Sequence, residues 1–206
     1  SKDNLCKLLL LYSSSFSAGY ELWKSDGTET GTVRIKGGFT AAVPDYFVNN
    51  NGVLYFASGT NDTGSEIWKS DGTESGTVIV KDIYLGTSSS NPTNLTNVNG
   101  VLYFQANNGA NGYELWKSDG TESGTVMVKD IYSGASSSNP TNLTNVNGIL
   151  YFQANNGTNG VELWKSDGTE SGTVMVKDIN TSSPVGSGLT YLTNINNVLY
   201  FQANNG

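Results

Sequence analysis

One segment occurs four times in the sequence, and this repetition constrains the fold more than any other feature. The segment Glu-Leu-Trp-Lys-Ser-Asp-Gly-Thr is complete in three copies. In the remaining copy, the second along the chain, Ile67 replaces the Leu. The four copies carry Trp23, Trp68, Trp116 and Trp164, which are 45, 48 and 48 residues apart. Residues 69–116 and 117–164 differ at only six of 48 positions. The chain is therefore predicted to be an array of one structural unit, copied with little change.

Each unit is predicted to contain four short β-strands. In one copy the strands are expected at Asn94–Val98, Val101–Ala106, Tyr113–Ser118 and Thr125–Ile131. Asn99-Gly100 lies between the first two, and this dipeptide favours a type I′ hairpin because both of its residues tolerate positive φ. Four antiparallel strands repeated about every 48 residues are typical of β-propeller blades. A two-layer β-sandwich is the less favoured alternative, since it does not require near-identical units.

The predicted fold is an all-β propeller with four blades, formed by residues 1–206 as a single domain. Complete blades are expected at about 43–83, 92–131 and 140–179, after an irregular N-terminal segment, 1–19. Residues 20–36 supply only the third and fourth strands of a unit, and residues 189–206 supply only the first two. The fourth blade is therefore predicted to be split between the N-terminal and C-terminal segments.

The two half-blades can complete each other in two ways. Pairing within one chain closes a ring and removes the exposed strand edges. Pairing between chains instead gives a head-to-tail contact that does not close, and hence a filament. Leu8–Tyr12 lies where a second strand is expected and competes with Val198–Ala203 for that position. The candidate residues for strand exchange are Leu8, Leu9, Leu10, Leu11, Val198, Leu199, Tyr200 and Phe201.

The repeated motif resembles a known family. Glu114–Thr121, followed by Gly124-Thr125 and Val128–Ile131, is similar to the ELWxxDGT repeat of secreted and surface-attached microbial proteins. The resemblance implies a propeller-like array in a secreted, extracellular or cell-surface setting, and it implies no particular activity. The chain departs from the pattern at Ile67 and at Gly37-Gly38, where the other copies have Asp-Ile.

Composition excludes several classes of function. The net charge is -7, with 11 Lys and Arg against 18 Asp and Glu, whereas nucleic-acid binding depends mainly on basic residues. The absence of histidine removes the commonest general base and the commonest zinc ligand. The longest apolar run, Leu8–Tyr12, is far shorter than the ~20 residues that a membrane helix needs. We expect neither nucleic-acid binding nor membrane insertion.

The four tryptophans are predicted to pack between blades. Each occupies the same mid-strand position, which favours burial of its large apolar area with the indole N–H bonded to backbone. The alternative is a ring of aromatic platforms that stack on sugars.

The acidic residues do not predict catalysis. All but three of the 18 recur at repeat positions, so they lie in near-identical environments, whereas a glycosidase needs two carboxylates with separated pKa values. We expect no enzyme activity and no cofactor. Calcium is a weak alternative at the Asp-Gly-Thr-Glu turns, because hard cations prefer oxygen ligands; otherwise the Asp holds its own turn. The weak candidate ligands are Asp71, Glu74, Asp119, Glu122, Asp167 and Glu170.

Repetition itself indicates the class of function. Near-identical units present the same surface several times, which favours multivalent or self-associating contacts over a single catalytic pocket. The predicted function is a non-enzymatic extracellular structural or adhesive module that assembles head to tail with copies of itself. The alternative is a lectin-like or calcium-assisted propeller, with cell-surface or matrix glycans as partners.

Overall fold

The protein is all-β. The computed structural model describes residues 19–182 and 184–206, which contain strands and turns and no helix, and hence no helix that could cross a membrane. The strands of the first three units, one partial and two complete, are β1 (Tyr20–Lys24), β2 (Val33–Phe39), β3 (Ala42–Asn50), β4 (Val53–Thr60), β5 (Gly64–Ser70), β6 (Val78–Lys81), β7 (Thr93–Val98), β8 (Val101–Asn107), β9 (Tyr113–Ser118) and β10 (Val126–Lys129). The remaining strands are β11 (Thr141–Val146), β12 (Ile149–Asn155), β13 (Val161–Ser166), β14 (Val174–Lys177), β15 (Thr190–Ile195) and β16 (Val198–Gln202).

Three four-stranded antiparallel sheets form the middle of the chain: β3–β6, β7–β10 and β11–β14. In each sheet the strands are joined in sequence order, so every pairing is between consecutive strands. The turn between β7 and β8 has φ of 52° at Asn99 and 88° at Gly100, the positive values that a type I′ turn requires. In the same sheet, β8 pairs with β9 so that Phe104 lies opposite Trp116. This register places the two large side chains side by side on one face.

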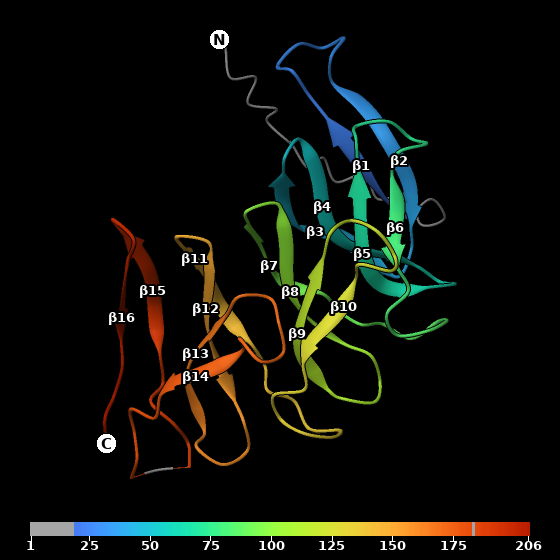
Figure 1. The fold of residues 1–206 in the computed structure, drawn as a ribbon. Helices are drawn as coiled ribbons and strands as arrows, with labels where there is room; N and C mark the ends of the chain where they lie inside the picture. Colours follow the sequence, from blue (N-terminus) through green and yellow to red (C-terminus); the bar gives the residue numbers. More distant parts are fainter. Residues whose placement is uncertain (1–18, 183) are drawn as a thin grey trace.

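The sheets follow one another in a row (Figure 1), and each contacts the next. The first strands of successive units, β3, β7, β11 and β15, lie against one another along the row. The two-stranded sheets β1–β2 and β15–β16 stand at opposite ends of this row, with the three complete sheets between them.

The split fourth blade is not formed within the described residues. Residues 20–36 contribute to the sheet β1–β2 and residues 189–206 to the sheet β15–β16, and these remain separate sheets. The physical reason is that β1–β2 packs on β3–β6 while β15 packs on β11, which holds the two half-sheets at opposite ends of the row. Val198, Leu199, Tyr200 and Phe201 lie in β16. Leu8, Leu9, Leu10 and Leu11 lie outside the described residues.

The buried core consists of clusters that each join two consecutive sheets. The cluster between β3–β6 and β7–β10 includes Ile67 and Val80 from the first sheet and Phe104 and Trp116 from the second. Corresponding clusters join β1–β2 to β3–β6 and β7–β10 to β11–β14. Full burial of one such side chain contributes about 1.5–3 kcal/mol, so the sheets depend on their neighbours for stability.

Two phenylalanines at the same repeat position provide a test of this dependence. Phe104 is fully buried, whereas Phe201 is 37% exposed. Phe104→Ala is expected to lower the free energy of unfolding by about 3–5 kcal/mol because it leaves a cavity between two sheets. Phe201→Ala in dilute protein is expected to cost less than half as much. Urea denaturation followed by tryptophan fluorescence measures both, and equal losses would contradict the proposed role of the junctions.

Candidate functional site

Three of the four tryptophan strands pack their sheet onto the preceding sheet. Trp116 of β9 lies in one buried cluster with Ile67 and Val80 of the sheet before it. Trp68 and Trp164 repeat this arrangement one sheet earlier and one sheet later, against Leu22 with Ile35 and against Leu115 with Val128. Trp23 is half-buried on β1, at the beginning of the row. Aromatic burial at these junctions leaves Trp68, Trp116 and Trp164 no open face for stacking on a sugar.

The hydrogen bonds expected from the indole N–H groups to backbone are not formed. The Nε1 atoms of Trp68, Trp116 and Trp164 are buried without a partner among the described residues. Only Trp23 has a partner, and it is a side chain: Nε1 donates to Glu21 Oε2 at 3.0 Å. The expectation of a backbone acceptor was wrong because these rings lie in apolar clusters, where no acceptor of the described residues is within hydrogen-bond distance of the three nitrogens.

Lysines add a polar contact to each junction. Lys69 Nζ donates to the backbone oxygen of Gly120, in the Asp-Gly-Thr turn of the following sheet, at 2.9 Å. Lys24 and Lys117 make the same contact with the following sheet at 2.8 Å, to Gly72 and Gly168. A second set joins Lys81 to the Thr125 oxygen and Lys129 to the Thr173 oxygen, each at 2.9 Å. The junctions therefore have a direction: lysines of one sheet bind carbonyls of the next.

The Asp-Gly-Thr turns present these carbonyls in a fixed conformation. Asp119 Oδ1 accepts hydrogen bonds from the Thr121 backbone N–H at 2.8 Å and hydroxyl at 2.7 Å. These bonds, of which the hydroxyl bond is the stronger influence, hold the pKa of the Asp119 carboxyl below its usual value. Gly124 closes the turn, and a Cβ there would collide with the Asp119 carboxylate. The motif therefore needs its second glycine for space.

The weak calcium candidates lie in these turns. Asp71, Asp119 and Asp167 each accept hydrogen bonds from the Thr two residues later. Glu74, Glu122 and Glu170 are exposed on the same turns. Within residues 19–182 and 184–206, no group of three or more His, Cys, Asp or Glu side chains gathers in a geometry that could hold a metal ion. The Asp carboxylates act as structural acceptors in their own turns.

A buried glutamate in each complete sheet anchors the connector that follows the sheet. Glu114 Oε2 accepts the Ile131 N–H at 2.9 Å and the Ser138 hydroxyl at 2.5 Å, and Oε1 accepts the Ser138 N–H at 2.9 Å. Glu66 binds Ile83 and Ser90 in the same way. Burial raises the pKa of both carboxyl groups to about 7, although the hydrogen bonds oppose this shift. These glutamates are fully buried and reach no surface where a substrate could bind.

This anchoring role was not predicted from the sequence, although a signal was present. Glu114 and Trp116 alternate with Leu115 along the strand, so the glutamate shares the face of the buried tryptophan. A carboxylate on such a face requires several donors. Ser138, the last residue of the Ser-Ser-Ser run, supplies two of them from 24 residues away, and the Ile131 N–H supplies another.

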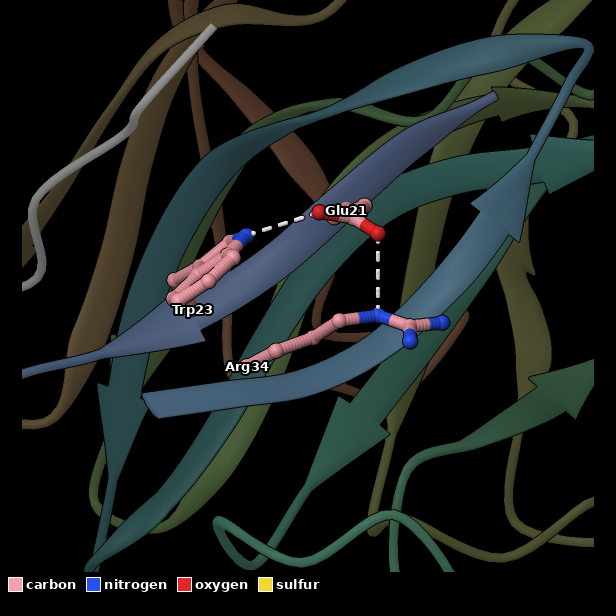
Figure 2. A network of polar contacts seen from close by, with 3 residues as sticks. All are labelled: Glu21, Trp23 and Arg34. Carbon is pink, nitrogen blue, oxygen red and sulfur yellow. Dashed lines mark hydrogen bonds and ion pairs between the residues drawn. The ribbon is translucent and has the colours of Figure 1, made fainter. Parts of the chain in front are cut away.

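The first sheet departs from this pattern (Figure 2). Glu21 lies at the position of the buried glutamates, but its Oε1 pairs with Arg34 Nε at 3.0 Å and its Oε2 accepts the Trp23 indole N–H. The segment after β2 contains no Ser-Ser-Ser run, which leaves Glu21 without the usual donors. Arg34 occurs in this copy alone.

The last complete sheet exposes residues that its predecessors bury. Val176 of β14 is 44% exposed, whereas Val80 and Val128 at the same position are 5% and 6% exposed. Phe201 is similarly exposed on β16. Lys165 and Lys177 are exposed and donate to no described residue, although their counterparts bind carbonyls of a following sheet. We refer to Lys165, Val176, Lys177 and Phe201 as the C-terminal surface; it is the candidate interaction site.

Comparisons with known proteins add little to this description. No protein-family model matches the chain, and no curated protein matches it. Among solved structures the chain is similar to an endo-1,4-β-xylanase from Bacteroides thetaiotaomicron VPI-5482, with 16% identity and a TM-score of 0.34. The match covers 77% of this chain and 64% of the xylanase chain, so the chain spans less than two thirds of that protein's length. A similarity at this level carries no argument about fold or activity.

The glutamate anchor can be tested by one isosteric substitution. Glu114→Gln places an amide NH₂ where both carboxylate oxygens accept N–H groups, so at least one buried donor loses its acceptor. We expect the free energy of unfolding to fall by about 2–4 kcal/mol. Glu122→Gln, on an exposed turn of the same unit, is the matched control and is expected to change it by less than about 0.5 kcal/mol. Urea denaturation at pH 5 measures both, because the folded chain then holds Glu114 uncharged and little of its contribution has been lost to ionisation.

The raised pKa values predict how stability depends on pH. A carboxyl group with a higher pKa in the folded chain than in the unfolded chain stabilises the fold below its unfolded pKa of 4.5. That contribution is lost as the pH rises through the folded value of about 7. We therefore expect the free energy of unfolding to decrease between pH 5 and pH 8, measured by denaturation at a series of pH values.

The chain has no histidine, so few other side chains titrate in this interval. The double variant Glu66→Gln, Glu114→Gln should show a much flatter profile. An unchanged slope in the double variant would assign the pH dependence to other groups.

Proposed function

We propose that this protein is a non-enzymatic structural or adhesive module whose chains associate head to tail into a filament or surface layer. In this proposal the four-stranded sheets are blades of a propeller-like array. The resemblance to the ELWxxDGT repeat supports an extracellular or cell-surface setting. The observation that carries the proposal is the C-terminal surface. It exposes Val176 and Phe201 at positions that are buried at every earlier junction, and two lysines at positions that are half-buried there.

The buried environments of the sheets support the absence of catalysis. Glu66 and Glu114 have carboxyl pKa values raised to about 7, a property often found in catalytic acids. Both are fully buried, however, and their oxygens are occupied by donors from a connector. Their environments are also alike, whereas acid and base catalysis needs two carboxylates with different pKa values.

Exposed strand edges support association between chains. Among the described strands, β16 pairs only with β15, so its other edge offers unpaired backbone groups. An open edge beside an exposed apolar side chain favours pairing with another chain.

Association should depend on protein concentration. We expect light scattering of the purified 206-residue protein to show a mass that increases with concentration, and electron microscopy at high concentration to show linear particles. The physical reason is that a head-to-tail contact leaves the next copy's surface free to bind again. A single monomeric mass over the whole concentration range would overturn the assembly proposal.

A further inference from the structure

Three of the junctions between consecutive sheets, those that join β1–β2, β3–β6, β7–β10 and β11–β14, share a common set of contacts. In each, a tryptophan of the following sheet packs on aliphatic side chains of the preceding one. In each, a lysine of the preceding sheet binds the glycine carbonyl of an Asp-Gly-Thr turn in the following sheet. Because three copies agree, the contacts of one more junction can be derived by repeat position.

The junction between β11–β14 and β15–β16 is half formed. Its inner part is present: the Thr144 hydroxyl donates to the Leu192 oxygen at 3.3 Å, as the Thr96 hydroxyl does to Leu143 one junction earlier. Asn194 Nδ2 likewise donates to the Asn145 oxygen at 2.9 Å. Its outer part, a tryptophan strand with an Asp-Gly-Thr turn, is missing among the described residues, and this leaves the C-terminal surface exposed.

The sheet β1–β2 carries the missing outer part. It has Trp23 on its first strand and an Asp-Gly-Thr turn in which Asp26 Oδ1 accepts the Thr28 N–H at 2.9 Å, as in the other turns. Gly27 has φ of 93°, close to the 89° of Gly120 and Gly168. Gly120 and Gly168 lie against tyrosines of the preceding sheet, whereas no described atom outside the turn lies within 4 Å of a Cβ built at Gly27.

We propose that the C-terminal surface binds the sheet β1–β2 of a second copy of this chain. The incoming β1 runs antiparallel to β16, with Trp23 opposite Phe201 and Leu22 opposite Gln202. This register repeats that of Trp116 with Phe104 and Leu115 with Gln105. The assignment rests on the head-to-tail association proposed above and specifies its interface.

The residues of the C-terminal surface each gain a partner in this arrangement. Trp23 of the second copy seats on Leu163 and Val176, as Trp116 seats on Ile67 and Val80. Lys165 donates to the Gly27 carbonyl, as Lys69 does to Gly120. Lys177 donates to the Thr32 carbonyl, as Lys129 does to Thr173.

Charge also favours this partner. The Thr121 hydrogen bonds are the main cause of the lowered pKa of the Asp119 carboxyl, and the charge of Lys69 from the preceding sheet lowers it a little further. Lys165 takes the same place relative to Asp26 of the second copy, so a cation meets an anionic turn across the interface.

The test uses two variants, each of which disrupts one of the two surfaces that form the proposed interface. Val176→Glu puts a carboxylate where Trp23 of the second copy would lie, and Trp23→Ala removes the ring itself. Each variant alone is expected to raise the concentration needed for association by about 100-fold or more, because burial of an unpaired charge or loss of a central aromatic residue is costly. A 1:1 mixture of the two is expected to form a heterodimer and nothing larger, because it contains one intact interface.

One matched control lies on the same strand as the tested residue, and the other lies on the strand paired with it. Val174 is 37% exposed on β14, and its counterparts Val78 and Val126 stay exposed at completed junctions. Val174→Glu should therefore leave association unchanged. Val33, at the same repeat position on β2, provides the control for the other side through Val33→Glu. Circular dichroism of each variant checks that it is folded.

The outcomes separate this inference from the broader function. If the unsubstituted protein associates but the folded Val176→Glu and Trp23→Ala proteins do not form a heterodimer, this interface is wrong and the assembly proposal stands. If Val174→Glu blocks association as strongly as Val176→Glu, the interface is also wrong. If the unsubstituted protein stays monomeric and Val176→Glu destabilises it, β1–β2 of the same chain occupies the surface, and both proposals fail.

Discussion

The packing of one tryptophan strand on the preceding sheet is the interaction on which the rest of the structure depends. Each sheet is a thin meander of short strands, and it buries large side chains only where a neighbour covers it. Trp116 fills the space over Ile67 and Val80, and the lysine contacts then fix how the two sheets are offset. The indole N–H groups of Trp68, Trp116 and Trp164 have no protein partner among the described residues, so these rings hold the junctions through apolar packing.

Much of the fold could be predicted from the sequence because its local signals agree. Asn99-Gly100 marks a hairpin turn, and the alternation of Tyr113–Ser118 marks a strand, and both are confirmed within antiparallel four-stranded sheets. The pairing of the half-sheets could not be predicted, because it depends on where β1 and β16 are held by their neighbours. The same strand pattern is compatible with ring closure, exchange or an open row.

The candidate site was predictable only in part. Val198–Phe201 was predicted from the sequence as a candidate for strand exchange, whereas the roles of Lys165 and Lys177 emerged only from comparison with Lys69 and Lys81 in the structure. A lysine at a repeat position looks like an ordinary surface residue, since the carbonyl that it binds lies about one repeat away. The glutamate anchor was missed for the same reason: its donors, among them both groups of Ser138 in the serine connector, are distant in sequence.

The strictly consecutive order of the sheets has a consequence for folding and for the origin of the array. All strand pairings within a sheet are between adjacent strands, and each sheet contacts the next one along the chain. The residues that meet at a junction are therefore only about one repeat apart in sequence. Contacts this local favour fast folding, in which the folded region grows unit by unit from any starting unit. A unit could also be gained or lost by duplication or deletion without disturbing contacts elsewhere, which accounts for two copies that differ at only six of 48 positions.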